Sequence, residues 1–581
     1  MAEREANEFD HIAISTRSNC QNETGKNDMQ INTSRWKTKL SEERIARFTG
    51  SGHWNNLIIA HNAAEMAVRF SNDVALVDGT TIRTHAQIFE EALRLAEWFR
   101  SNGLQPGDVI SFQLPNWWET VTINLAACIF GLIVNPIVPI YRDAEVEYIL
   151  KNSESRIFFI PEVFRSINYV EMVDKLRPLL PNLETIVVVR GQATRDDFVC
   201  YGDWNEGNLL ASMGVDPSKP PELDPNTIKM LLYTSGTTGR AKGVLHSHNA
   251  IQAEIAAVTK FWDLTKDDVI LMPSPVTHIT GYIYGIELMS AIGCKLVYMD
   301  KWNADHAVDL IAEHEVTFSI GATPFLVELV TALEKRGESS ASLRLFACGG
   351  APVAPEVIRR AQAVLPNCLA FRVYGSSEAP TVTAGVASGD PVELGATTDG
   401  CILNYEVKIV DPVTGERLRD GTEGEILVRG PELMLGYAEW QDTLDAFDDE
   451  DYFRTGDLGF ISHERYITIS GRKKDLIIRG GENISAKEVE DVLHNHPAIA
   501  EAAVVAMPDE RLGETPVAYV VLRKGKSVAF EELKAFLEEA KLARQKFPER
   551  LFILAEMPRT ASGKILKHVL RAQCQDGGDD A

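Results

Sequence analysis

The sequence contains few cysteines, and none of them occurs in a metal-binding or redox pattern. Its eight cysteines are scattered over 581 residues, without a C-x-x-C pair or a Cys/His ligand spacing. Disulfide-stapled secreted domains and small zinc modules need closely spaced cysteines, so both classes are disfavoured. The pattern indicates a reducing compartment, and we expect a cytoplasmic protein.

The sequence also lacks an apolar run long enough to cross a membrane. In its most apolar stretch, Val121–Ile140, Asn124, Asn135 and two prolines interrupt the run. This stretch predicts a buried helix followed by a buried strand instead of a spanning segment, and a peripheral membrane contact stays compatible with it. Residues 1–34 are polar and differ from a secretory signal or a transit peptide, so we expect a flexible leader there.

Basic residues are in the minority. The chain has 58 Lys and Arg against 83 Asp and Glu, a formal net charge of -25. Nucleic-acid binding requires a net basic face, so the charge argues against this class of partner, and we expect none. An anionic small substrate would have to be bound by local basic loops. The length exceeds what one hydrophobic core covers and predicts two or more domains.

One loop concentrates the residue types that bind phosphate. The stretch Tyr233–Val244 reads YTSGTTGRAKGV. Glycines let backbone N–H groups approach an anion, hydroxyls donate further hydrogen bonds, and Arg240 and Lys242 supply charge. A Walker A loop needs Gly directly before the lysine and Ser or Thr directly after it, whereas Ala241 and Gly243 stand there. A kinase-like or GTPase-like NTPase is therefore disfavoured.

From Asn72 onward, short β-rich runs alternate with helical patterns, which is typical of a mostly parallel sheet covered by helices. Ligands of such sheets bind beyond the carboxyl ends of the strands. The loop after Tyr233 follows a predicted strand, as do Gly349–Pro352 and Tyr374–Glu378, so we expect three loops to converge on one edge. The predicted strands are Asp108–Leu114, Arg156–Ile160, Thr185–Val189, Met230–Thr234, Val269–Met272, Leu296–Met299, Thr317–Ile320, Leu343–Ala347 and Leu369–Val373.

The pattern changes twice towards the C-terminus. After Gly395, short strands and Asp-Pro or Asp-Gly turns predict a small β subdomain. Beyond Lys474, a strand, a Gly-Gly turn, a helix over Ala486–Asn495 and a helix over Phe530–Ala540 predict a compact α+β unit. We thus expect an α/β protein: a leader at 1–34, a large N-terminal domain of mostly parallel sheets with flanking helices and a small β subdomain at 35–473, a small mobile α+β C-terminal domain at 474–571, and an acidic tail at 572–581.

Five ordered motifs together resemble the adenylate-forming (AMP-binding) superfamily, which contains acyl-CoA synthetases, luciferases and peptide-synthetase adenylation domains. They are the phosphate loop Tyr233–Val244, the Y-G-x-[ST]-E motif Tyr374–Glu378, the ribose motif Thr455–Asp457, the hinge Gly471–Asp475 and the lysine motif Pro558–Lys564. The phrases Phe112–Trp117, Gly321–Phe325 and Ala347–Gly350 look most like bacterial medium-chain fatty-acid and cyclohexanecarboxylate CoA ligases. Ala241 replaces a common proline, and Ser377 a common threonine.

The resemblance implies a reaction in two halves. A carboxylate attacks the α-phosphorus of ATP to give acyl-AMP and pyrophosphate, and the thiol of CoA then displaces AMP to give a thioester. Crowded negative charge requires cations and a metal ion. The implied substrates are a medium-size carboxylic acid, linear or alicyclic, ATP and CoA, with Mg²⁺ as activator; a homodimer is compatible with the sequence.

The resemblance also assigns roles to individual residues. Thr234 and Glu378 would hold Mg²⁺, and Lys564, Glu378, Thr234 and His278 would be catalytic. The implied ATP and AMP contacts are Thr234, Ser235, Gly236, Thr237, Thr238, Gly239, Lys242, Gly350, Ala351, Tyr374, Gly375, Ser376, Ser377, Asp457, Arg472 and Lys564. Lys474 would be the hinge, and the turn Arg479, Gly480, Gly481, Glu482 and Asn483 would line the CoA channel. The acyl pocket would comprise His278, Gly281, Tyr282, Gly321, Ala322, Thr323 and Gly349.

Each residue also has a plain structural interpretation. Alone, Glu378 would be a helix N-terminal carboxylate, Asp457 a turn carboxylate and Lys564 a solvated lysine. His278 would be a core histidine, and the pocket walls would be ordinary core. Two other functions stay open: adenylation that feeds a carrier protein, and a catalytically silent nucleotide-binding regulatory protein.

Overall fold

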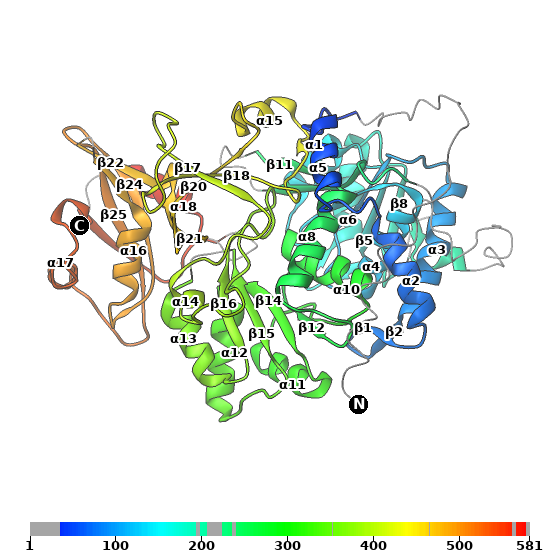
Figure 1. Cartoon of the computed structure of the whole chain (residues 1–581), viewed down its shortest axis with the longest axis horizontal. Helices are drawn as coiled ribbons and strands as arrows, with labels where there is room; N and C mark the ends of the chain where they lie inside the picture. The colour runs from blue at the N-terminus through cyan, green and yellow to red at the C-terminus, as the bar shows by residue number, and fades with distance from the viewer. Residues whose placement is uncertain are drawn as a thin grey trace. The chain divides into compact units, whose positions relative to one another are not determined.

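The computed structural model describes residues 35–192, 198–205, 223–234, 240–350, 353–463, 465–480, 482–559 and 565–576. The predicted leader lies outside these residues, as do Ser235, Gly236, Thr237, Thr238, Gly239, Ala351, Gly481 and Lys564. The unit formed by Trp36–Ala581 contains four main β-sheets and the helices that cover them (Figure 1).

The eight-stranded sheet carries the strand that leads into the phosphate loop. Its order is β19-β11-β10-β4-β3-β5-β8-β9; β10 is antiparallel to β11 and β11 to β19, and the other neighbours are parallel. The bounds are β3 Val109–Phe112, β4 Ile133–Pro136, β5 Ile157–Pro161, β8 Thr185–Val189, β9 Phe198–Cys200, β10 Ile228–Thr234, β11 Lys242–Ser247 and β19 Gly436–Tyr437.

The seven-stranded sheet has the order β16-β15-β14-β12-β13-β1-β2, with all pairs parallel except β1–β2. Its strands are β1 Val74–Asp78, β2 Thr81–Thr84, β12 Val269–Met272, β13 Lys295–Tyr298, β14 Phe318–Ala322, β15 Leu345–Gly349 and β16 Leu369–Val373. The loops after β15 and β16 therefore leave a different sheet from the phosphate loop. The prediction of one common sheet edge was wrong, because the sequence pattern of a strand does not say which sheet it joins.

Alternating side chains divide the core into layers. Ile110 and Ile270 pack into a core that both sheets share, whereas Leu271 faces a second core under α11–α13 and Val109 a third. Figure 1 shows α12 and α13 against β14–β16. The helices of this region are α1 Glu42–Gly50, α2 Ile59–Arg69, α3 His85–Ser101, α4 Trp118–Phe130, α5 Asp143–Ser153, α6 Tyr169–Leu176, α8 His248–Phe261, α9 Ile279–Gly281, α10 Leu288–Ile292, α11 Ala304–His314, α12 Thr323–Arg336, α13 Pro355–Val364 and α14 Leu394–Thr397.

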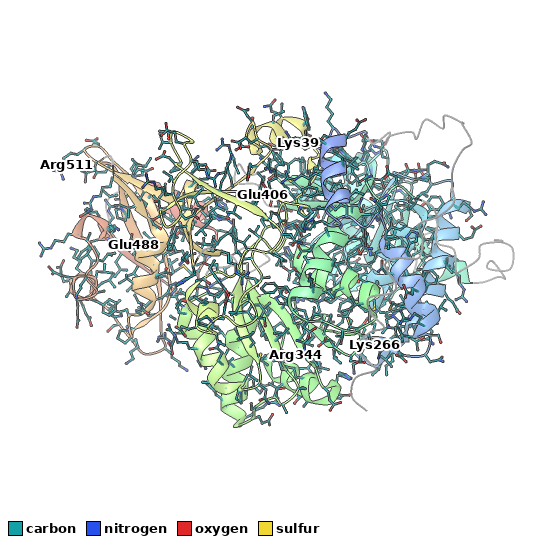
Figure 2. All side chains as sticks on the ribbon, in the orientation of Figure 1. Lys39, Lys266, Arg344, Glu406, Glu488 and Arg511 are labelled. Atoms are coloured by element: carbon teal, nitrogen blue, oxygen red, sulfur yellow. The ribbon has the colours of Figure 1, made fainter. Side chains whose placement is uncertain are left out.

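Polar contacts fix the ends of these elements. At the start of α3, Gln87 N donates to Thr84 Oγ1 and Thr84 N donates to Gln87 Oε1, the capping box that the sequence predicts. Arg344, labelled in Figure 2, donates to both oxygens of Asp268 at 3.0 and 2.9 Å and so joins the start of β15 to the loop before β12. The predicted helix-then-strand over Val121–Ile140 is α4 followed by β4.

The β subdomain is the four-stranded sheet β17-β18-β20-β21, followed in the chain by the C-terminal sheet. The strands are β17 Glu406–Val410, β18 Gly424–Arg429, β20 Phe453–Ser462, β21 Tyr466–Arg472, β22 Leu476–Arg479, β23 Glu482–Ser485, β24 Ile499–Asp509, β25 Gly513–Leu522 and β26 Arg550–Leu554. The helices are α15 Trp440–Ala446, α16 Ala486–His494, α17 Phe530–Glu539 and α18 Lys567–Asp576. None of the described helices is long and apolar enough to span a bilayer.

Two details differ from the sequence prediction. The helix α18 continues to Asp576, so the domain end predicted at 571 falls inside a helix. Buried Leu570 and Cys574 pack on the C-terminal sheet, and Tyr519 Oη lies 3.0 Å from Cys574 Sγ, which explains why the helix goes on. In addition, Tyr282–Glu287 forms a π-helical turn between α9 and α10, a conformation that apolar periodicity does not reveal.

Candidate active site

A cavity of about 580 Å³ lies at the carboxyl ends of β12, β14, β15 and β16. Its wall combines apolar side chains with polar loops, as in most small-molecule sites. Nine predicted site residues line it: His278, Gly321, Ala322, Gly349, Gly350, Tyr374, Gly375, Ser376 and Ser377. The structure thus brings the predicted acyl pocket and the predicted adenine loops together on one cavity.

Three residues predicted for the acyl pocket lie outside its lining: Gly281, Tyr282 and Thr323. Gly281 packs so tightly that a Cβ there would come within 2.1 Å of the Pro275 carbonyl oxygen. The Tyr282 side chain points into the core, where its hydroxyl accepts from Lys229 Nζ at 3.0 Å. Thr323 begins α12. Their contribution to the pocket is therefore indirect, through the backbone that carries His278 and Ala322.

His278 occupies the position immediately before α9. Its backbone N–H donates to the Pro275 carbonyl at 3.0 Å, and its own carbonyl accepts from Tyr282 N at 2.8 Å. The tight turn from Pro275 to Gly281 thereby sets the direction in which the imidazole faces the cavity.

The predicted ribose residues form a connected group. Tyr374 Oη donates to Asp457 Oδ2 at 2.8 Å, and Arg472 Nε lies 2.9 Å from Asp457 Oδ1. The Asp457 carboxylate raises the pKa of Arg472, while burial, followed by that carboxylate, raises the pKa of Tyr374 well above its usual range. A buried carboxylate between a neutral hydroxyl and a fixed cation is suited to accept hydrogen bonds from sugar hydroxyls.

The phosphate loop closes a β-hairpin. Thr234 and Lys242 pair across β10 and β11, so the chain between them, residues 235–241, joins two antiparallel strands. A Walker A loop instead connects a strand to a helix, and this geometry agrees with its exclusion from the sequence. Lys242 Nζ lies 2.9 Å from Asp442 Oδ1, and Arg240 Nε donates to Tyr148 Oη at 2.7 Å.

Glu378 has a buried tyrosine as partner. Tyr437 Oη donates to Glu378 Oε1 at 2.8 Å, and Glu378 carbonyl oxygen accepts from Met434 N at 2.9 Å. Sequence reasoning missed Tyr437, since nothing in its local pattern shows that the two-residue strand β19 adds to β11. Glu378 and Thr234 offer hard oxygen donors, the kind that Mg²⁺ prefers, so these residues fit the metal predicted for them. No group of three or more potential His, Cys, Asp or Glu ligands occurs in the described part of the chain.

The predicted hinge lies between β21, a strand of the β subdomain, and β22, a strand of the C-terminal sheet. Lys474 sits in the 3-10 turn Lys473–Asp475 between β21 and β22, and Asp475 is paired with Arg571 of α18. Burial lowers the pKa of Lys474, and the positive charge of Arg472 lowers it further. At the predicted CoA turn, Gly480 has φ +60° and Arg479 Nη1 donates to the Gln545 carbonyl at 2.5 Å. Glu482 and Asn483 belong to β23. Arg559 and Ile565 form an isolated antiparallel bridge, and Lys564 is outside the described residues.

Known proteins are similar to this chain in sequence and in fold. Residues 63–438 match the family model of AMP-binding enzymes, and residues 488–564 match the C-terminal domain of AMP-binding enzymes. The chain is 36% identical over 550 residues to the medium-chain fatty-acid–CoA ligase of Escherichia coli (strain K12), covering 94% of this chain and 95% of that protein. It is 28% identical over 546 residues to the 2,3-dihydroxybenzoate-AMP ligase of Bacillus subtilis (strain 168), covering 92% and 96%.

Among solved structures, ATP-bound MatB from Rhodopseudomonas palustris superposes with a TM-score of 0.77 at 26% identity, covering 89% of this chain and 99% of that chain. The chain belongs to the AMP-binding enzyme family. The predicted superfamily, the α/β fold class and the class of AMP-forming acid–thiol ligases are confirmed. The roles of the individual site residues stay predictions.

Proposed function

We propose that this enzyme activates a medium-size carboxylic acid with ATP and Mg²⁺ and transfers the acyl group from acyl-AMP to CoA. The observation that carries this proposal is the single cavity of about 580 Å³ that runs from the Tyr374–Ser377 loop to an apolar wall. The wall residues Ile279, Ile283, Ile320 and Phe325 can hold an alkyl chain or an alicyclic ring. The E. coli relative named medium-chain fatty-acid–CoA ligase supports the size class.

In the proposed adenylation, the acid enters with its apolar part against this wall and its carboxylate beside His278. Asp457 and Arg472 hold the ribose end of ATP, and Tyr374 packs against the adenine. Thr234 and Glu378 would hold Mg²⁺, which neutralises phosphate charge when bound. Lys242 and the backbone of the phosphate loop bind the triphosphate, so that the α-phosphorus faces the carboxylate.

The C-terminal domain supplies the remaining groups in this proposal. Lys564 contacts both the substrate carboxylate and the α-phosphate, where its ammonium offsets the negative charge that builds up during adenylation. Rotation at Lys474 then removes Lys564 and brings the Arg479–Asn483 turn to the CoA channel. The contacts of Asp475 with Arg571 and Lys567 make this turn a defined joint, since α18 holds one side of it.

The test is a panel of acids from acetate to long-chain, cyclic and aromatic acids, scored by acid-dependent AMP and acyl-CoA formation. We expect the highest kcat/KM for medium-size aliphatic or alicyclic acids with purified CoA as acceptor. Preference for acetate or for very long chains alone would overturn the size class. AMP formation without a CoA thioester would favour a carrier protein as acceptor, and no acid-dependent pyrophosphate release would favour a silent regulatory protein.

Aromatic acids belong in the panel because of a specific observation. The chain is similar over almost its whole length to a 2,3-dihydroxybenzoate-AMP ligase. An aromatic ring needs a flat slot with polar groups for its substituents, whereas the wall between Ile279 and Phe325 is apolar. The aliphatic proposal therefore predicts weak use of dihydroxybenzoate.

The hinge proposal has its own test. Lys474→Pro fixes one backbone angle of the joint and removes its N–H donor. We expect it to slow thioester formation or adenylation by restricting the rotation. If both half-reactions keep wild-type rates, Lys474 is not the hinge.

A further inference from the structure

One buried tyrosine connects residues from two separate motifs. Tyr437 Oη donates to Glu378 Oε1 at 2.8 Å, and Lys242 Nζ lies 4.9 Å from the centroid of the Tyr437 ring. Glu378 ends the loop after β16, and Lys242 begins β11 in the other sheet. Tyr437 is thus a physical link between the proposed metal residue and the proposed phosphate cation.

The tyrosine itself is held from several sides. Its side chain is buried, its strand β19 pairs with β11 at Val244, and its backbone N–H donates to Thr443 Oγ1 at 2.8 Å. Thr443 is fully buried in α15, whose Asp442 pairs with Lys242 at 2.9 Å. The short helix α15 therefore fixes both the tyrosine and the lysine.

The geometry at the carboxylate is specific. The Tyr437 hydroxyl holds Oε1 of Glu378 in place through this hydrogen bond and leaves Oε2 for another ligand. Oε2 has no hydrogen-bond partner among the residues that the structure describes.

We infer that Tyr437 is a positioning residue that orients the Glu378 carboxylate and the Lys242 ammonium towards the metal–triphosphate group. The inference rests on the proposed function. Residues that orient metal ligands through a hydrogen bond contribute about 10- to 100-fold to metal affinity. The ring adds a second effect, because a cation above an aromatic face is held in place.

The experiment compares Tyr437→Phe with wild type by titration calorimetry of ATP without acid, over a series of Mg²⁺ concentrations. Phe keeps the ring over Lys242 and removes only the hydroxyl. We expect the Mg²⁺ concentration for half-maximal ATP affinity to rise about 10- to 100-fold, with Mg²⁺-free ATP affinity unchanged. The ratio of the two affinities is the readout, because partial unfolding lowers the binding stoichiometry and leaves this ratio intact.

Tyr405→Phe is the matched control. Tyr405 is a buried tyrosine of the same core cluster, and its hydroxyl donates to the Pro380 carbonyl at 3.0 Å instead of to the Glu378 carboxylate. We expect this control to keep the wild-type Mg²⁺ dependence. A double variant Tyr437→Phe/Glu378→Gln should be no worse than Glu378→Gln alone, since the tyrosine acts through that carboxylate.

The outcomes distinguish a failure of the positioning role from a failure of the proposed metal site. If Tyr437→Phe has the Mg²⁺ dependence of wild type, or if Tyr405→Phe shifts it equally, the positioning role is wrong. If ATP binding by wild type does not depend on Mg²⁺, the proposed metal site at Thr234 and Glu378 is wrong.

Discussion

Asp457 and Arg472 face each other across the antiparallel strands β20 and β21, with Arg472 Nε 2.9 Å from Asp457 Oδ1. The two residues come from the ribose motif and the hinge motif, which the antiparallel pairing of β20 and β21 brings together. Asp457 is only 5% exposed, so its charge is held by Arg472 and Tyr374 and is screened little by water. This arrangement holds the carboxylate in place for its proposed contact with the two hydroxyls of a ribose.

The first prediction concerns Asp457→Asn. We expect AMP binding to weaken about 10- to 150-fold, because a hydrogen bond to a charged group contributes about 1.5–3 kcal/mol. Calorimetric titration of AMP measures it. The matched control is Asp390→Asn, since Asp390 also accepts from a tyrosine, Tyr466, at 2.7 Å and from an arginine, Arg465, at 3.2 Å, but belongs to none of the five motifs. Equal AMP affinity in the two variants would contradict a ribose role for Asp457.

The second prediction concerns Gly281→Ala. The added Cβ would come within 2.1 Å of the Pro275 carbonyl oxygen, which accepts the His278 N–H, so the turn must shift. We expect kcat/KM for the acid to fall on the order of 100-fold, as for a displaced substrate-positioning group, with AMP affinity retained. Gly285→Ala is the control, because its nearest neighbour is the flexible Met272 side chain at 3.1 Å. Normal acid use by Gly281→Ala would show that this turn does not position the acid.

The third prediction is a pH dependence of stability. Burial raises the pKa of Glu254 from its ordinary value to about 7, against the opposing hydrogen bonds of Thr381 and Tyr284. The folded state therefore binds a proton that the unfolded state has released, and stability falls as the pH rises from about 4.5 through 7. Glu254→Gln removes this loss. The difference in free energy of unfolding between Glu254→Gln and wild type should therefore rise, in favour of the variant, by up to about 3 kcal/mol from pH 4 to pH 8.

Urea unfolding at several pH values measures this difference. The control is Glu356→Gln, the same substitution at a side chain that is 80% exposed. A constant difference between Glu254→Gln and wild type over this range would contradict the assignment.

Much of this architecture follows from local pattern. The strands over Thr185–Val189, Val269–Met272 and Leu369–Val373 have the predicted bounds, because continuous β-branched and apolar runs between turn residues allow little else. The loops that line the cavity could be predicted from the ends of the strands and from the order of the motifs. How these loops assemble could not be predicted from the sequence. Glu378 contacts Tyr437 only because β19 pairs with β11, and strands that are distant in sequence carry no local signal of their pairing. Likewise, Tyr282 stands in sequence between the lining residues Thr280 and Ile283, but the π-helical turn directs its hydroxyl to buried Lys229.

The fourth prediction concerns that buried lysine. Lys229 and Glu287 form an ion pair with both side chains almost fully buried, and Asn124 Nδ2 donates to Glu287 Oε1 at 2.8 Å. Lys229→Met leaves a buried carboxylate without its cation, and we expect a loss of about 3–5 kcal/mol in the free energy of unfolding. Denaturant titration measures it, with Lys534→Met of the exposed pair Lys534–Glu531 as a control that should lose at most about 1 kcal/mol. Adding Glu287→Gln should restore part of the loss.

The last prediction separates the two half-reactions. Lys564→Ala removes the ammonium proposed to contact carboxylate and α-phosphate, and we expect acid-dependent pyrophosphate release to fall on the order of 100- to 1000-fold. The thioester step, started from supplied acyl-AMP and CoA, should keep nearly its wild-type rate, because Lys564 has left the site in the proposed second conformation. Lys524→Ala, an exposed lysine after β25, controls for the loss of one charge in this domain. Equal slowing of both steps by Lys564→Ala would mean that the lysine stays at the site during both half-reactions, which would contradict the proposed rotation at Lys474.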